Sequence, residues 1–112
     1  MSSQAQGLLC QYLSEDMSGI NLGTLDLPEI EKDLVKIKIS HASLNFPDWL
    51  MSQGKYQRKP ELPFFLGMEG SGIIESIGPD AKELQIGDEV MFGGWGHGAM
   101  ANYIVCLLYT SP

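Results

Sequence analysis

The sequence has no long hydrophobic run. No apolar segment approaches the roughly 20 residues that a helix needs to cross a bilayer, which argues against a membrane-spanning helix and a membrane partner. The first six residues, Met1 to Gln6, also lack the basic residues and the apolar stretch of a secretory signal. We therefore expect a cytoplasmic protein.

Basic residues are scarce as well. Seven lysines and arginines stand against 14 acidic residues, and the formal net charge is −7. A nucleic-acid surface needs clustered cations, so this balance predicts no nucleic-acid partner. Lys55, Arg58 and Lys59 follow the predicted helix closely, and we interpret them as solvated positions; the alternative is that they meet an anionic ligand.

Cysteine and histidine occur only twice each. The candidate metal ligands among them are Cys10, Cys106, His41 and His97. No Cys-x-x-Cys or His-x-x-x-His spacing is present, whereas catalytic zinc needs three protein ligands and an open position, so no metal site is predicted. The two cysteines are expected to be free, partly buried thiols rather than a disulfide pair. His97 lies among glycines and is expected in an exposed loop.

Glycine and proline are plentiful, with 13 and 6 residues that separate short β-rich segments. This rhythm favours a mainly β fold over a helical bundle. A chain of 112 residues suits one domain, which buries about 65% of the surface of its unfolded form. We expect strands at residues 7–12, 20–25, 34–43, 72–77, 89–92 and 103–108, and a short helix at 46–52.

The segment 34–43 has the clearest strand pattern. Val35, Ile37 and Ile39 alternate with polar residues at the period of two of a half-buried strand. His41 falls on the same face in this register, so we interpret it as a partly buried histidine rather than a ligand. The loop expected after the helix runs over residues 57–65, because two prolines restrict the backbone there.

The helix at 46–52 is predicted from two local features. Pro47 stands where the first turn of a helix tolerates proline, and Gly54 is placed to end the helix. The glycine cluster that begins at Gly70 does not match a dinucleotide fingerprint, whereas the cluster that begins at Gly96 fits the spacing of a phosphate loop but not its context. Glu75 replaces the third small residue of the cluster that begins at Gly70, and a predicted strand follows the cluster that begins at Gly96. Tight turns and close strand approach explain these glycines better.

Four short motifs follow one another in order: Asn45-Phe46-Pro47-Asp48, Gly54-Lys55-Tyr56, Gly67-Met68-Glu69-Gly70-Ser71-Gly72 and Gly87-Asp88-Glu89-Val90. Together they resemble the start of the zinc-free, NADPH-dependent quinone oxidoreductases of the medium-chain dehydrogenase/reductase superfamily. The resemblance implies a GroES-like, partly open β-barrel with a short helix. In the family a Rossmann domain follows, and this chain is expected to lack it. The resemblance also implies that NADPH is bound mostly by that missing domain and that the full-length parent is a homodimer.

The resemblance divides the chain into two parts. Residues 1–106 are expected to form the catalytic barrel. Residues 107–112 do not resemble the proline-containing stretch that leads toward the Rossmann domain in the family, and we expect a non-native or frameshifted tail. The chain by itself is then expected to be inactive.

The resemblance also suggests the site residues. Zinc-dependent relatives carry a cysteine near Asn45 and a histidine where Met68 stands, and a thioether is a poor zinc ligand. Without zinc as a Lewis acid, the acceptor is expected to be a quinone or a conjugated enone, which spreads charge through its own π-system. Asn45 and Tyr56 are the predicted catalytic residues, which orient the acceptor. Asn45, Asp48 and Met68 are the predicted contacts of NADPH, and no metal is expected.

Each of these residues has a simpler interpretation. Asn45 could serve only as a helix cap, Asp48 could be a surface helix residue near the positive end of the helix dipole, and Tyr56 could be ordinary packing. Glu69 is interpreted as a partly buried carboxylate held by backbone donors, and Trp95 could rim the substrate cleft. Two other functions stay open at this point. They are an enoyl or enone reductase of the same superfamily and a GroES-like binding module without catalysis.

Overall fold

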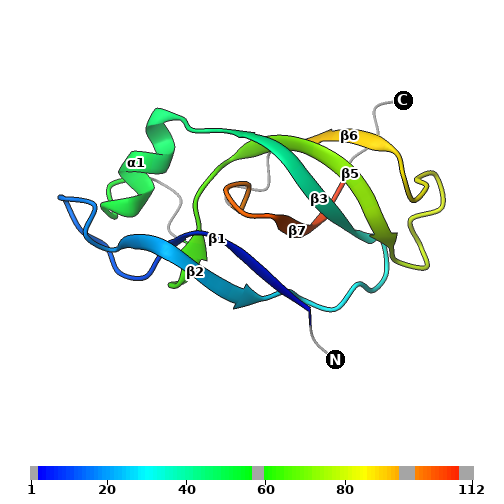
Figure 1. Ribbon diagram of the computed structural model, residues 1–112, viewed down its shortest axis with the longest axis horizontal. Coiled ribbons are helices and arrows are strands. Elements are labelled where there is room, and N and C mark those ends of the chain that lie inside the picture. The colour runs from blue at the N-terminus through cyan, green and yellow to red at the C-terminus, as the bar shows by residue number, and fades with distance from the viewer. Residues whose placement is uncertain (1–2, 57–59, 94–97, 109–112) are drawn as a thin grey trace.

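The computed structural model describes residues 3–56, 60–93 and 98–108, and it is made mostly of strands with one short helix (Figure 1). The elements are β1 (Gln4–Cys10), β2 (Ile20–Asp26), β3 (Leu34–Ser43), α1 (Phe46–Ser52), β4 (Phe64–Phe65), β5 (Glu69–Ile77), β6 (Glu89–Phe92) and β7 (Tyr103–Leu107). The mainly β prediction is therefore confirmed. Among the described residues, no helix is long and apolar enough to cross a membrane.

The strands form two antiparallel sheets. One has the order β2-β1-β4, and the other has the order β6-β5-β3-β7. An isolated bridge between Gly7 and Ala101 joins the two sheets, and the Leu8 N–H donates to the Met100 carbonyl beside it at 2.8 Å. Within the described ranges no ladder of hydrogen bonds runs from β4 to β7, so the barrel is partly open, as expected.

The alternation of β3 holds over its first half only. Val35 and Ile37 are fully buried and Ile39 partly so, as the period of two predicts. The pairing of β3 with β5 then shifts register between Ile39 and His41. Such a bulge re-aims the side chains that follow it, and His41 is exposed. The interpretation of His41 as a partly buried residue was wrong for this reason.

The loop expected at 57–65 contains a short strand. Phe64 and Phe65, which are both buried, pair with Cys10 and Leu9 of β1. Two consecutive buried residues show no alternation of apolar and polar side chains, so this strand could not be predicted from the sequence. The strand expected at 72–77 also begins earlier, at Glu69, because its glycine-rich start pairs with the end of β3. The first strand begins at Gln4 and ends at Cys10, three and two residues before its predicted bounds.

Helix α1 begins and ends as predicted. Pro47 lies in its first turn, Gln53 is its C-cap, and Gly54 follows with a positive φ of 74°. The Gly54 N–H donates to the Met51 carbonyl at 3.1 Å, and the Lys55 N–H donates to the Leu50 carbonyl at 2.9 Å. These two bonds form a Schellman motif, which satisfies the last carbonyl groups of the helix.

The core consists of three packed groups of buried side chains. The first lies within the larger sheet and includes Val35, Ile37 and Cys106, while the third joins β1, β4 and β7. The second, which we call the helix-side core, consists of Cys10, Met51, Phe64 and Leu66. Both cysteines are free thiols, as expected, but they are fully buried. Burial raises the pKa of the Cys10 thiol and raises the pKa of Cys106 to about 11.

Candidate functional site

Two of the predicted site residues, Asn45 and Asp48, belong to the start of α1, which lies at the same end of the molecule as the connection between β1 and β2 (Figure 1). Asn45 is the N-cap of α1, with an extended backbone at φ −123° and ψ 162°. The Asp48 N–H donates to the Asn45 carbonyl at 3.0 Å, and the Asn45 N–H donates to Asp48 Oδ2 at 2.8 Å. The second bond is the half of a capping box in which the third helical residue reaches back to the cap.

Asp48 is not a surface residue. Its side chain is 0% exposed, so that alternative was wrong. The cause is the other carboxylate oxygen, Oδ1, which accepts a hydrogen bond from the Gly67 N–H at 3.1 Å. A buried carboxylate is tolerated when hydrogen-bond donors satisfy its oxygens, and two backbone N–H groups do so here. Asp48 therefore joins the start of α1 to the segment between β4 and β5.

Gly67 is held firmly from the other side. The Ala99 N–H donates to the Gly67 carbonyl at 3.1 Å, and the neighbouring Met100 N–H donates to the Leu66 carbonyl at 2.7 Å. Gly67 has a φ of +100°, and a Cβ built on it would lie 2.7 Å from the Met100 backbone nitrogen. Only glycine fits this backbone without strain. The position of Met68, the next residue, follows from these contacts.

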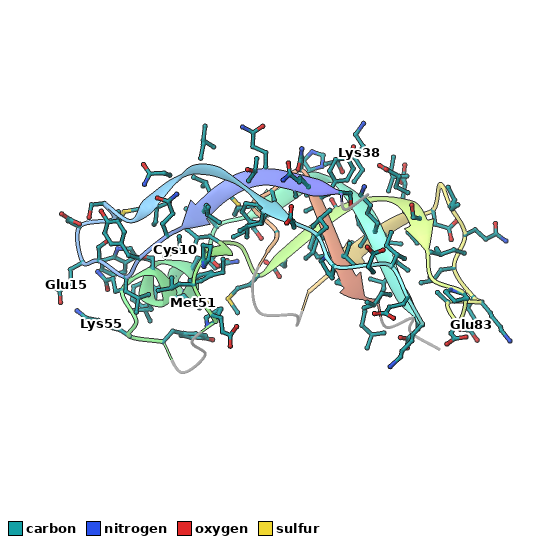
Figure 2. All side chains as sticks on the ribbon, turned by 90° about the horizontal axis from the view of Figure 1, so that it is seen from below. Cys10, Glu15, Lys38, Met51, Lys55 and Glu83 are labelled. Atoms are coloured by element: carbon teal, nitrogen blue, oxygen red, sulfur yellow. The ribbon has the colours of Figure 1, made fainter. Side chains whose placement is uncertain are left out.

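Tyr56 reaches the same region from the other end of α1. The Schellman motif turns the chain at Gly54, and the partly buried side chains of Tyr56 and Met68 both pack against the helix-side core. Figure 2 shows two members of that core, Cys10 and Met51, at the α1 end of the molecule. Tyr56 and Met68 therefore share one apolar support, although 12 residues of sequence separate them.

The four predicted residues are thus linked into one unit. Asn45 is joined through Asp48 to Gly67, which precedes Met68, and Met68 shares its core with Tyr56. Asn45, Tyr56 and Met68 are each partly exposed, whereas Asp48 is buried. The three partly exposed side chains thus offer an amide and a phenol, which both donate hydrogen bonds, and a thioether. The Asn45 side chain carries an NH₂ group, which can donate hydrogen bonds.

Glu69 does not match its sequence interpretation. It is exposed, and its Oε1 accepts a hydrogen bond from the Ser43 hydroxyl at 2.8 Å rather than from backbone donors. The pair lies on the wall of a shallow groove of about 310 Å³ on the β3–β5–β6 sheet. Residues that line this groove include His41, Ser43, Glu69, Ser71, Met91 and Phe92. Asn45, Tyr56 and Met68 do not line it.

Metal ligands do not cluster in the part of the chain that the structure describes: no group of three histidine, cysteine or acidic side chains is placed to hold an ion. The predicted independence of zinc stays a prediction. Arg58, Lys59, Trp95 and His97 lie outside the described residues, as does Gly96 at the start of the second glycine cluster.

Two features that help to position the candidate site were not predicted from the sequence. The first is the Gly67 N–H, whose only local signal is that Gly67 opens a glycine-containing motif. The second is the connection between β1 and β2, which is tied to the end of α1: the Ser14 N–H donates to the Ser52 carbonyl at 3.0 Å, and Lys55 forms an exposed ion pair with Glu15 at 3.2 Å (Figure 2). Nothing in the sequence near Ser14 predicts this contact, because the pairing spans about 40 residues.

Comparison with known families gives one match. The sequence profile of the family described as "Alcohol dehydrogenase GroES-like domain" matches residues 31–108. This range contains all four predicted site residues and every element from β3 to β7.

Known proteins with similar sequences include relatives described as VAT-1 homolog-like and as quinone oxidoreductase-like. "Synaptic vesicle membrane protein VAT-1 homolog-like" of Mus musculus is 35% identical over 75 residues, which are 67% of this chain and 18% of that protein. "Quinone oxidoreductase-like protein 2 homolog" of Nematostella vectensis is 37% identical over 79 residues, which are 70% of this chain and 20% of that protein. The chain thus spans about a fifth of the length of these relatives.

Solved structures match over nearly the whole chain. The human synaptic vesicle membrane protein VAT-1 homolog-like protein superposes with a TM-score of 0.84 at 27% identity, over 94% of this chain and 33% of that one. The quinone oxidoreductase from Coxiella burnetii gives a TM-score of 0.80 at 26% identity, over 94% of this chain and 35% of that one.

Proposed function

The chain belongs to the family of alcohol dehydrogenase GroES-like domains, and on that basis we propose that it is the substrate-side domain of a longer oxidoreductase that reduces quinones or conjugated carbonyl compounds with NADPH. Relatives described as quinone oxidoreductase-like support the reaction class. Residues 1–106 form the domain in this proposal, and a cofactor domain lies in sequence beyond it. The complete protein acts as a homodimer in the cytoplasm.

The observation that carries the proposal is that two hydrogen-bond donors, Asn45 and Tyr56, are both linked to the segment that contains Met68. Asn45, at the start of α1, is joined through Asp48 to Gly67, which precedes Met68. Tyr56, beyond the other end of α1, packs against the same core as Met68, and neither Asn45 nor Tyr56 is fully buried. Donors that are fixed before the substrate arrives stabilise charge that develops during a reaction, because they need no reorganisation. The Asp48 carboxylate and the Schellman motif supply that fixation.

The roles follow from the chemistry of each side chain. NADPH, when bound, supplies the hydride. The Asn45 amide and the Tyr56 hydroxyl donate hydrogen bonds to the acceptor oxygen, on which negative charge grows as the acceptor is reduced. Met68 offers an apolar, polarisable surface to the flat ring of the acceptor or of the nicotinamide. A quinone suits this set, because its conjugated ring shares the charge that a metal would otherwise stabilise.

The first experiment reads the source transcript in frame beyond Cys106 and expresses the complete product. NADPH oxidation is then followed with benzoquinone, with a conjugated enone and with an enoyl thioester. Turnover of the quinone alone supports the quinone reductase, and turnover of the enone or the thioester alone supports the enone reductase instead. A stop codon directly after Pro112, together with a stably folded chain that self-associates, contradicts both and leaves a binding module without catalysis.

Two substitutions test the named residues in the complete product. Asn45→Ala is expected to lower kcat about 100-fold, the usual effect of removing one donor to a developing oxyanion. Tyr56→Phe is expected to lower kcat about 10-fold, the equivalent of one neutral hydrogen bond. Asn21→Ala and Tyr12→Phe are matched controls, since both residues are exposed and lie outside the linked unit. Equal activity of test and control variants contradicts the assignment.

A further inference from the structure

We infer that Asp48 is a positioning residue, which sets where Asn45 stands relative to Met68 and makes no contact with the cofactor. The inference rests on the proposed function for its catalytic consequence and on the geometry of the chain for the rest. It gives Asp48 a role other than the one predicted from the resemblance, where it accompanies Asn45 and Met68 as a direct NADPH contact.

The first argument is that the carboxylate is already occupied. Oδ2 accepts from the Asn45 N–H at 2.8 Å and Oδ1 accepts from the Gly67 N–H at 3.1 Å. The residue is 0% exposed, so no atom of its side chain is open to a ligand. A direct contact with NADPH would need α1 to move and one of these buried donors to lose its partner, which is unfavourable.

The second argument is that the two donors belong to different parts of the site. The Asn45 N–H belongs to the N-cap of α1, whereas the Gly67 N–H lies 19 residues beyond Asp48 along the chain, next to Met68. The Asp48 carboxylate therefore connects Asn45, a predicted catalytic residue, with the backbone next to Met68. Bonds from backbone N–H groups to a carboxylate are short and directional, so they fix position better than apolar contact does.

The third argument is that one side of this link is rigid. Gly67 is held by the Ala99 N–H, and its neighbour Leu66 is held by the Met100 N–H. Helix α1 has only seven residues, too few to keep a fixed position without tertiary contacts. Asp48 thus ties the start of α1 to the fixed position of Gly67. A reactant that is misplaced by about 1 Å can lose about 100-fold in rate.

The test compares Asp48→Asn with Asp88→Asn. Asp88 is a matched control because its Oδ2 accepts from the Gln85 N–H at 3.0 Å, also three residues away, at a turn between β5 and β6. Each substitution removes one charge and leaves one acceptor oxygen in a side chain of the same shape. At position 48 the new NH₂ group must face one of the two backbone N–H groups, so one of the two bonds is lost.

The first readout is amide hydrogen exchange in the 112-residue chain, which needs no enzyme activity. In Asp48→Asn the Asn45 or Gly67 amide is expected to exchange at least 10-fold faster relative to the amides of β1 and β3, and Asp88→Asn is expected to leave both unchanged. If Asp48→Asn does not fold, the unsubstituted chain still decides: its Gly67 amide must exchange more slowly than the exposed Gln85 amide. Equal rates overturn the inference.

The second readout is kinetic, in the complete product with NADPH and benzoquinone. A positioning role predicts that Asp48→Asn lowers kcat about 10- to 100-fold and changes the KM for NADPH less than about threefold. A rise in that KM with unchanged kcat and unchanged Gly67 exchange shows a direct cofactor contact and overturns the inference. An inactive unsubstituted protein refutes the proposed function alone, because the exchange experiment stands without it.

Discussion

Replacement of Gly67 by alanine tests how closely the chain packs around the site. Two effects add at this position. The φ of +100° lies in a region that a residue with a Cβ occupies at a cost of about 1–3 kcal/mol. The new Cβ also lies 2.7 Å from the Met100 backbone nitrogen and 2.9 Å from the Ala99 Cβ, which forces the backbone to move and costs about 1–3 kcal/mol more. We therefore expect a loss of about 2–6 kcal/mol in the free energy of unfolding.

Gly87 provides a control that isolates the second effect. Its φ of +97° nearly equals that of Gly67, but a Cβ built on it meets nothing within 4 Å. Gly87→Ala should therefore show the backbone cost alone, about 1–3 kcal/mol. The difference between the two variants measures the close approach of Gly67 to the segment at Ala99 and Met100.

Urea unfolding followed by tryptophan fluorescence and circular dichroism gives both free energies from the same buffer. A small domain has only about 5–15 kcal/mol in total, so Gly67→Ala is expected to lower the midpoint markedly or to prevent folding. If Gly67→Ala is as stable as Gly87→Ala, the backbone is not packed around Gly67 as described, and the argument for Asp48 loses its fixed point.

Three further predictions concern the thiol, the core and the surface. Burial raises the pKa of Cys106 from 9.0 to about 11, so the protonated thiol favours the folded state. The contribution of Cys106 to the free energy of unfolding should be complete below about pH 9 and should be lost between about pH 9 and 11. In parallel urea titrations, Cys106→Ala should remove that part of the pH dependence. Ile37→Ala should cost about 2–5 kcal/mol because Ile37 is 0% exposed, whereas Leu22→Ala, at a site 74% exposed, should cost less than about 1 kcal/mol; equal losses in thermal unfolding would contradict the assignment of the core. Glu15→Gln should change the unfolding free energy by no more than about 0.5 kcal/mol, since its ion pair with Lys55 is exposed, and a larger loss would show that the pair holds the β1–β2 connection.

The helix illustrates what could be predicted from nearby residues. Asn45, Pro47 and Gly54 mark its start, its first turn and its end, and the structure confirms the bounds 46–52. The capping residue, the proline and the glycine act on backbone groups within four residues, so a reader of the sequence sees every participant. The alternation of apolar and polar residues predicts the buried face of β3 for the same reason, up to the bulge before His41.

The elements that were misjudged depend on partners far along the chain. Phe64 and Phe65 become a strand only because β1 offers them a free edge. The local sequence around Asp48 is typical of an exposed residue in the first turn of a helix. Asp48 is instead buried, where the Gly67 N–H donates to its second carboxylate oxygen. Glu69 is exposed because β5 begins at that residue and pairs with the end of β3. No pattern within one segment carries this information.

Local composition and periodicity were thus enough for the mainly β class and most strand bounds, while the resemblance of the motifs indicated the family and suggested Asn45, Tyr56 and Met68 as candidate site residues. The tertiary structure alone decided that Asp48 is buried and joined to Gly67, that Tyr56 and Met68 pack against one core, and that His41 and Glu69 face outward. The physical reason is the range of the interactions. Periodicity and capping act within a few residues, whereas hydrogen bonds such as that from Gly67 to Asp48 exist only after segments 19 or more residues apart have been packed together.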